Sequence, residues 1–252
     1  MLLRPILARA ERLWPGREAL ICGDLRLTYA GAAERVRRLA DGLAGRGVGR
    51  GDRVAILHPN DHVFFEAYHA AAWLGAVLVP LNTRLTAREL AAIVDDAGCS
   101  MAVVAPGLLP VAREALERSA TRPELLESGQ GGSYEALLAA SRGVDPPDEG
   151  VGEDDAAQIY YTSGTTGAPK GVVLTHCNVA AHALAAIAEL GLDDADVWLH
   201  AAPMFHLADA WATFAVTWVG VRTCSCRASS RRASWTRWRR SASRSPTWSR
   251  RC

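Results

Sequence analysis

Apolar residues along most of the chain alternate between helical spacing and short continuous runs. Helical spacing predicts amphipathic helices, and short apolar runs between turn residues predict buried strands. Helices are expected after Thr28, over residues 63–74, from Thr86, over residues 108–119, 134–140 and 178–190, and after His206. Strands are expected over residues 53–57, 76–79, 101–105, 157–161, 172–174 and 197–201. This alternation predicts an α/β fold in which helices pack on a largely parallel sheet.

The boundaries of these elements carry local signals. Thr86 and Glu89 have the spacing of a capping box. Residues 1–16 have apolar positions at helical spacing with arginines between them, which predicts a short amphipathic helix and not a signal peptide. Residues 141–155, rich in proline and acidic side chains, predict a surface linker. The glycine-rich residues 45–52 follow a helix and precede a strand, the reverse of a dinucleotide-binding loop, and predict a helix end and a turn.

The composition favours a folded protein without a membrane segment. Of the 252 residues 49% are apolar and the formal charges nearly cancel, so the chain is long enough to bury a core. The apolar runs at residues 70–81 and 210–219 are shorter than the roughly twenty residues that a membrane span requires. The six cysteines have no paired CxxC spacing, so neither a zinc site nor a disulfide framework is predicted. A cytoplasmic protein is expected.

One segment, YYTSGTTGAPKGVVLTH at residues 160–176, combines glycines, hydroxyl side chains and the single lysine of the chain. Lys170 is the one lysine among 28 basic residues, and its mobile ammonium group suits the outer phosphates of a nucleotide. The hydroxyl side chains that can donate to phosphate oxygens are Thr162, Ser163, Thr165 and Thr166. The glycines expected to bend into positive φ and to let backbone amides approach an anion are Gly164, Gly167 and Gly171. The segment therefore predicts a clamp for a nucleoside triphosphate.

Two other interpretations of this segment are less favoured. Pro169 precedes the lysine and Gly171 follows it, whereas the Walker loop requires Gly-Lys followed by a metal-binding hydroxyl, so a P-loop kinase or GTPase is disfavoured. The segment could also be a polar hairpin turn, since Gly, Ser and Thr are ordinary turn residues. The length of the run and the position of the single lysine favour the phosphate clamp.

The segment resembles the phosphate-loop motif of the AMP-forming adenylating superfamily, which includes acyl-CoA synthetases, luciferase-type enzymes and the adenylation domains of peptide synthetases. Residues 27–43, 71–100 and 203–209 resemble further stretches of that family in the same order. Within them, residues 79–99 are more similar to acyl-CoA and aryl-CoA ligases than to amino-acid adenylation domains. The resemblance extends from Met1 to about Gly220 and implies the N-terminal part of an AMP-forming ligase.

The resemblance implies a reaction in two steps. A carboxylate attacks the α-phosphate of ATP to give an acyl adenylate and pyrophosphate, and coenzyme A then forms the thioester. The positions that match the motif and would hold the β and γ phosphates, together with Mg²⁺, are Thr162, Ser163, Gly164, Thr165, Thr166, Gly167 and Lys170. His206 lies where family members have a histidine near the acyl pocket and the thiol tunnel, although a single histidine considered alone is more often structural. The implied small-molecule partner is a fatty or aryl carboxylic acid.

The composition changes abruptly at Arg222. Residues 222–252 contain ten arginines, eight serines, three tryptophans and no acid, whereas residues 1–221 carry 18 basic and 27 acidic side chains. The chain is therefore expected to consist of a partial adenylating domain, residues 1–221, and a basic, unstructured tail, residues 222–252. We interpret the tail as a reading-frame slip near residues 219–222, because GC-rich coding DNA read out of frame produces this composition. The neighbouring frame is expected to encode a ligase-like continuation.

On this hypothesis the adenine-binding loop, the ribose-binding acid and the C-terminal domain of the family lie beyond the break. The isolated polypeptide is then expected to have little or no activity, because rotation of that domain completes each half-reaction in the family. Two alternatives stay open: a nucleotide-binding fragment without catalysis, and nucleic-acid binding through the arginines and tryptophans of the tail. The tail has no helical or strand periodicity, which disfavours the second alternative.

Overall fold

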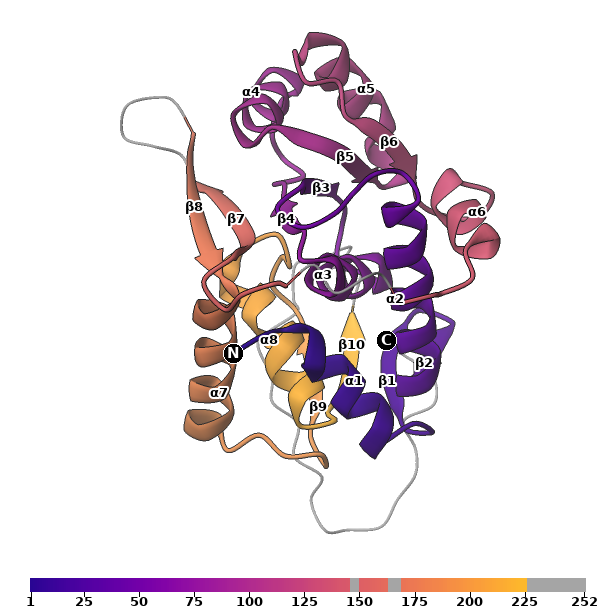
Figure 1. Ribbon diagram of the computed structural model, residues 1–252, viewed down its shortest axis with the longest axis vertical. Helices are drawn as coiled ribbons and strands as arrows, with labels where there is room; N and C mark the ends of the chain where they lie inside the picture. The colour runs from indigo at the N-terminus through magenta and orange to yellow at the C-terminus, as the bar shows by residue number, and fades with distance from the viewer. Residues whose placement is uncertain (146–149, 163–168, 226–252) are drawn as a thin grey trace.

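The computed structural model describes residues 1–145, 150–162 and 169–225 of the chain. These residues form two sheets with helices between and around them (Figure 1). The helices are α1 Arg4–Leu13, α2 Tyr29–Ala44, α3 His62–Leu74, α4 Ala87–Ala97, the 3-10 helix Pro106–Leu108, α5 Leu109–Arg118, α6 Ser133–Ala140, α7 His176–Leu190 and α8 Leu207–Trp218. The strands are β1 Glu18–Cys22, β2 Leu25–Thr28, β3 Arg53–Leu57, β4 Val77–Pro80, β5 Cys99–Val104, β6 Glu124–Glu127, β7 Ala156–Thr162, β8 Lys170–Thr175, β9 Val197–His200 and β10 Arg222–Ser225.

The larger sheet has the strand order β6-β5-β3-β4-β7-β8, and its neighbours are parallel except for the antiparallel pair β7 and β8. The smaller sheet has the order β2-β1-β10-β9, in which only β1 and β2 are antiparallel. The predicted α/β fold with largely parallel pairing is confirmed, but the strands are divided between two sheets. No helix in the described ranges is both long enough and apolar enough to cross a membrane.

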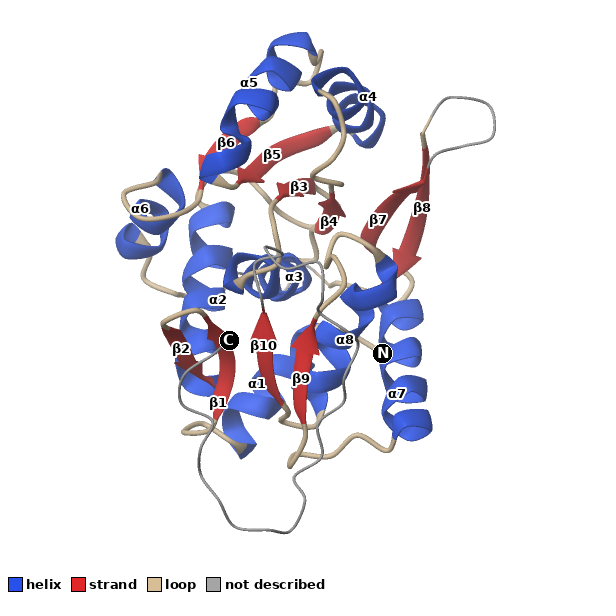
Figure 2. Cartoon of the chain, turned by 180° about the vertical axis from the view of Figure 1, so that it is seen from behind, coloured by secondary structure: helices blue, strands red, loops and turns tan. Residues whose placement is uncertain are grey.

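Helix α3 lies between the two sheets, as both views of the chain show (Figures 1 and 2). Its sequence is apolar on almost every face, and residues 63–74 are all buried. A helix that is apolar all round requires such an enclosed position. Asp61 caps it by accepting a hydrogen bond from the Val63 amide (2.9 Å), and Gly75 ends it in the left-handed conformation at φ 69°.

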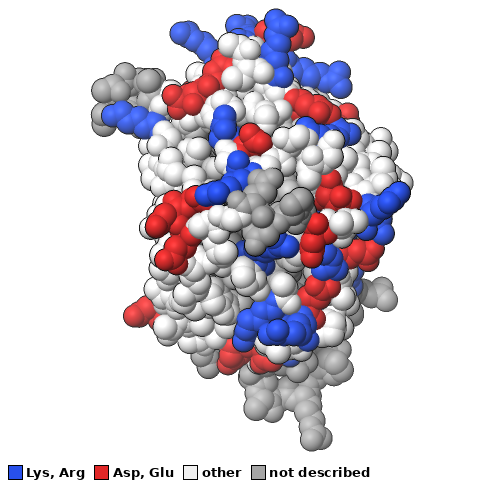
Figure 3. Space-filling model, in the orientation of Figure 1, with Lys and Arg blue, Asp and Glu red and all other residues white. Residues whose placement is uncertain are grey.

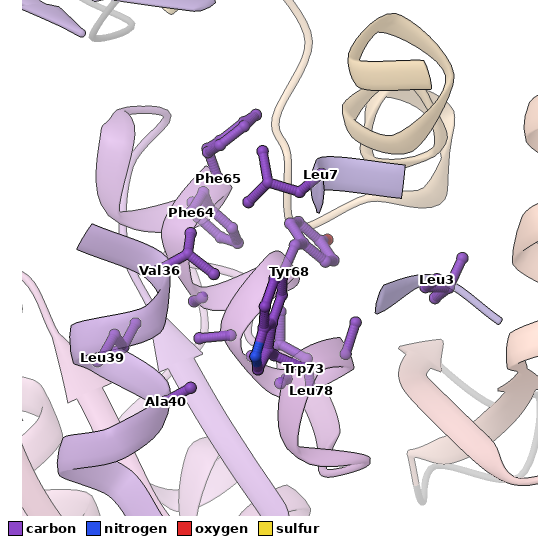
Figure 4. Packing of buried hydrophobic residues seen from close by; sticks show 14 of the residues in the cluster. Leu3, Leu7, Val36, Leu39, Ala40, Phe64, Phe65, Tyr68, Trp73 and Leu78 are labelled. Carbon is purple, nitrogen blue, oxygen red and sulfur yellow. The ribbon is translucent and has the colours of Figure 1, made fainter. Parts of the chain in front are cut away.

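The core around α3 is built from side chains far apart in the sequence. Figure 4 shows α1 and α2 contributing aliphatic side chains against the aromatic residues of α3. The labelled residues of this cluster are Leu3, Leu7, Val36, Leu39, Ala40, Phe64, Phe65, Tyr68, Trp73 and Leu78. A second cluster, on the other face of the larger sheet, packs β3, β4 and β5 against α4 and α5.

A charged cluster joins α2, α3 and α6. Arg35 donates to both oxygens of Glu66, which is fully buried (2.7 and 3.2 Å), and to both oxygens of Glu135 (3.1 and 2.7 Å). Tyr134 donates its hydroxyl to Glu66 at 2.6 Å. Burial alone would lower the pKa of Arg35. The hydrogen bonds to Glu135 and Glu66 have the larger combined effect and raise it. The buried carboxylate is therefore compensated from two sides.

Strand β10 corrects the expected domain division. Residues 222–225 pair in parallel with β1 and β9, and Thr223, Cys224 and Ser225 are buried. The expectation that the chain is unstructured from residue 222 onward is therefore wrong for these four residues, which belong to the smaller sheet. The rest of the predicted tail, residues 226–252, lies outside the described residues.

Candidate active site

The β7–β8 hairpin carries the two ends of the predicted phosphate clamp. Strand β8 is the edge of the larger sheet, and the hairpin projects at one side of the molecule (Figure 1). Thr162 and Lys170 are Cα partners in the antiparallel ladder. Of the predicted clamp residues, Ser163, Gly164, Thr165, Thr166 and Gly167 lie outside the described residues. The structure therefore places the first and last members of the clamp opposite each other.

Both Thr162 and Lys170 are exposed. Within the part of the chain that the structure describes, neither the Lys170 ammonium nor the Thr162 hydroxyl has a hydrogen bond or an ion pair. Positive and negative side chains are interspersed over the face shown in Figure 3. The local charge of Lys170, and not a broad basic surface, would therefore attract an anion to the hairpin.

Tyr161 anchors the hairpin to the body of the protein. Its hydroxyl donates to Asp96 Oδ2 at 2.6 Å, and burial together with this bond raises the pKa of Tyr161. Its Cα partner on β8 is Gly171. A Cβ added to Gly171 would lie 3.0 Å from Tyr161 Cζ and 3.0 Å from Ile159 Cγ2. Gly171 is thus required for close ring packing within a strand, and the expectation that it bends into positive φ is wrong.

Tyr68 of α3 joins the hairpin to the loop that precedes α8. Its hydroxyl donates to the Met204 carbonyl (2.8 Å) and lies 3.0 Å from the hydroxyl of Tyr160. Tyr160 belongs to β7 and donates in turn to Gln158 Oε1 at 3.0 Å. Burial raises the pKa of Tyr68, so its hydroxyl keeps its proton. The sequence did not indicate that the Tyr68 hydroxyl joins the hairpin to this loop, because a tyrosine among the apolar residues of a buried helix has the pattern of an ordinary core residue.

Asn60 holds the same loop from the other side. Its Nδ2 group donates to the carbonyls of His200 (3.1 Å) and Ala202 (2.6 Å), and its Oδ1 accepts from the Met204 amide at 2.7 Å. Neither Asn60 nor Tyr68 was among the site residues predicted from the sequence. A signal for Asn60 is its place just after the apolar strand β3, where parallel strands of α/β proteins present functional side chains.

His206 lies at the end of this loop and is exposed. Its carbonyl accepts from the amides of Asp209 (3.1 Å) and Ala210 (3.0 Å), so it is the residue that caps α8. Its ring packs against Phe205 with 4.6 Å between the centroids. Among the described residues, no hydrogen bond or ring contact joins His206 to Lys170. The hairpin that carries Lys170 and the loop that ends at His206 are joined through Tyr160, Tyr68 and Met204.

Behind this loop a buried pair supports the first turn of α8. His200 Nδ1 lies 2.9 Å from Asp209 Oδ2, and both side chains are almost completely buried. His200 is the last residue of β9, so the pair joins the C-terminal end of a parallel strand to the start of the helix that His206 caps. This contact orients the loop.

Comparisons with known proteins agree with this geometry. The sequence pattern of the family described as AMP-binding enzyme matches residues 7–245. Feruloyl-CoA synthase from Amycolatopsis sp is 40% identical over 200 residues, which cover 79% of this chain and 38% of that protein. The long-chain-fatty-acid–CoA ligase FadD13 from Mycobacterium tuberculosis is 40% identical over 185 residues, which cover 73% of this chain and 37% of that protein.

The similarity extends to three dimensions. The inhibitor-bound crystal structure of the N-terminal domain of FACL13 from Mycobacterium tuberculosis superposes with a TM-score of 0.83 and 34% sequence identity, covering 90% of this chain and 57% of that one. The chain spans about two fifths of the length of the curated relatives it matches. The helices packed on mostly parallel sheets match the N-terminal domain of acyl-CoA ligases. The chain therefore belongs to the AMP-binding enzyme family.

Proposed function

We propose that residues 162–170 bind the polyphosphate of ATP, and that the chain contributes to activation of a carboxylic acid to an acyl adenylate and then to an acyl-CoA. The observation that carries the proposal is the pairing of Thr162 with Lys170, which sets a hydroxyl and a cation, both exposed and without a partner among the described residues, at the two ends of the clamp segment. The names of the relatives support a ligase that consumes ATP and coenzyme A, with an aryl or a long-chain fatty acid as substrate.

In this proposal the protein positions the phosphates of ATP and stabilises their negative charge. The ammonium of Lys170 and the hydroxyl of Thr162 contact the outer phosphate oxygens, and they stabilise the negative charge that develops as pyrophosphate leaves. The hairpin is held at Tyr161 by Asp96, so these donors start from a fixed position. Ser163, Gly164, Thr165, Thr166 and Gly167 complete the clamp with hydroxyl and amide donors, and His206 lies near the acid and the thiol.

Mg²⁺ would neutralise charge on the phosphates when ATP is bound. Among the described residues, no group of three or more His, Cys, Asp or Glu side chains is arranged to hold a metal ion. The proposal therefore assigns the ion to the phosphate oxygens of ATP and to no protein ligand identified in the structure. The donors supplied by this chain are those of the hairpin.

Titration of the purified chain with ATP, followed by calorimetry, tests the proposal. Lys170→Ala is expected to weaken binding by about tenfold to a hundredfold, because a charge-assisted contact is lost, and Lys170→Arg is expected to weaken it less. Arg12→Ala, at an exposed arginine of α1, serves as the matched control and should leave affinity unchanged. Equal affinity in the unchanged protein and in Lys170→Ala would show that the hairpin is not the ATP site.

The same preparations, supplied with ATP, Mg²⁺ and either an aryl or a long-chain fatty acid, are assayed for acid-dependent release of pyrophosphate. The isolated polypeptide is expected to show little or no release, in line with the expectation from its sequence. Release that disappears in Lys170→Ala would establish adenylation by this chain. Saturable ATP binding without release would favour the alternative of a nucleotide-binding fragment.

A further inference from the structure

A cavity of about 540 Å³ opens between α5 and the turn that leads into β6. These elements lie at the top of the molecule in Figure 1, whereas the β7–β8 hairpin projects at its side. The volume falls within the roughly 300–1,000 Å³ typical of sites for small molecules. The residues that line the cavity are Arg113, Leu116, Glu117, Arg122, Pro123 and Leu125. None of them belongs to the hairpin, so a ligand bound here would not occupy the proposed ATP site.

Arg113 and Arg122 bring two positive charges to this cavity. Both residues are exposed, and within the described ranges neither guanidinium group has a hydrogen bond or an ion pair. Arg118, on the same helix as Arg113, differs because it pairs with Glu114 at 2.9 Å. A guanidinium group without a protein partner can donate two parallel hydrogen bonds to a phosphate or a carboxylate. The cavity is therefore a candidate site for an anion.

The backbone of Arg122 is a second, independent sign of a site. Its φ is 46°, and among the described residues it is the only one other than glycine with a positive φ. A residue with a Cβ adopts this conformation at a cost in free energy, and the proline that follows restricts Arg122 further. Residues held in such conformations are concentrated at functional sites. Glycine would relieve the strain, but it would also remove the guanidinium group from the cavity.

Asp95 of α4 fixes the turn that carries Arg122. Its Oδ1 accepts from the amides of Ala120 (2.9 Å) and Thr121 (3.1 Å) and from the hydroxyls of Ser119 (2.6 Å) and Thr121 (3.0 Å). The hydrogen bond from Ser119, together with those from the two residues that follow it, lowers the pKa of Asp95 to about 2. The Ser119 hydroxyl oxygen also accepts from the Arg122 amide at 3.4 Å. Arg122 is thus held in position before any ligand binds, which lowers the entropic cost of binding.

We propose that this cavity binds an organic phosphate, a small molecule that joins a phosphate group to an apolar or aromatic part. The phosphate lies between the guanidinium groups of Arg113 and Arg122, whose two charges match the nearly two negative charges of a phosphate monoester at neutral pH. The apolar part packs on the two leucines and the proline of the lining. The carboxylate of Glu117 accepts a hydrogen bond from a hydroxyl or amino group of the ligand.

Phenyl phosphate is the probe, and the NMR shifts of the backbone amides of residues 112–122 report its binding. The unchanged protein should bind it saturably and about tenfold more tightly than inorganic phosphate, which cannot use the apolar lining, or benzoate, which carries one charge. Arg113→Gln and Arg122→Gly should each weaken binding by about tenfold or more, because a charge-assisted contact is lost. Arg118→Gln, on the same helix, is the matched control and should leave the affinity unchanged.

Arg122→Gly also reports on the strain. Glycine adopts a positive φ without strain, so the thermal midpoint of this variant should be at least that of the unchanged protein while its affinity for phenyl phosphate falls. If this variant fails to fold, Arg113→Gln decides. No saturable binding by the unchanged protein overturns the proposal, and so does native affinity in Arg113→Gln. Lys170→Ala should bind phenyl phosphate like the unchanged protein, so failure of this proposal is distinguishable from failure of the ATP site.

Discussion

Thr162 and Lys170 face each other across the ladder of β7 and β8, eight residues apart in sequence and opposite in register. The sheet thereby holds both ends of the clamp segment, and Tyr161 ties the hairpin to Asp96 of α4. A hydroxyl and an ammonium group that start from the same rung of a ladder can act on the same anion. This relationship makes separate tests of the two side chains informative.

Thr162→Val keeps the branched shape that suits a strand and removes the hydroxyl. We expect ATP to bind about fivefold to thirtyfold more weakly, because one hydrogen bond to a charged phosphate is lost, while the thermal midpoint of unfolding stays unchanged. Thr162→Ser restores the hydroxyl and should restore affinity, which calorimetry measures. Equal affinity of the valine and serine variants would remove the hydroxyl from the clamp.

Tyr68→Phe removes the hydroxyl that joins Met204 to Tyr160. The variant is expected to lose about 1–2 kcal/mol of unfolding free energy and to exchange the amide hydrogens of residues 204–206 faster. Tyr29→Phe is the matched control, because Tyr29 is also buried and donates to one carbonyl, that of Val221 at 2.8 Å. It should lose comparable stability without faster exchange at residues 204–206. The same exchange pattern in both variants would contradict a specific link through Tyr68.

Arg35→Leu leaves the buried carboxylate of Glu66 without its cation. We expect a loss of about 3 kcal/mol in urea unfolding near neutral pH. Arg118→Leu, which breaks an exposed pair with Glu114, should cost less than about 1 kcal/mol. A loss for Arg35→Leu no larger than that for Arg118→Leu would show that the buried Glu66 does not depend on Arg35.

Because of the buried His69, the free energy of unfolding is expected to decrease at acid pH. His69 lies between Phe65 and Phe214, with centroids 4.5 and 4.9 Å away, and burial lowers its pKa from 6.5 to about 3. As the pH falls below about 6.5, His69 takes up a proton in the unfolded chain, whereas in the folded chain it stays neutral until the pH approaches about 3. Folding stability should therefore decrease by up to about 1.4 kcal/mol per pH unit in the window between these two values.

His69→Gln keeps a polar, uncharged side chain and should flatten this dependence in urea unfolding measured across the window. The exposed His182→Gln variant should retain the slope of the unchanged protein. Carboxylates contribute equally to all three proteins, so the difference in slope belongs to His69. Parallel curves for His69→Gln and the unchanged protein would show that His69 is protonated in the folded state.

Local patterns along the chain predicted most of the elements correctly. The strand expected over residues 53–57 is β3, and the capping box of Thr86 and Glu89 is present at the start of α4. Periodicity misses β1, β2, β6 and β10, which are short and lie at sheet edges or in segments without alternation. Strand β10 has the sequence Arg-Thr-Cys-Ser, which has no apolar pattern typical of a strand. It forms because β1 and β9 pair with it on both sides.

The sequence by itself determined the family, the alternation of helices and strands, and the residues whose chemistry suits a polyphosphate, because these properties depend on neighbours along the chain. Only the tertiary structure decided that the strands form two sheets, that Tyr68 joins the hairpin to the loop before α8, and that Arg35 meets the buried Glu66. Those contacts join residues separated by tens of positions or more. Their formation depends on the path of the whole chain, which no local pattern records.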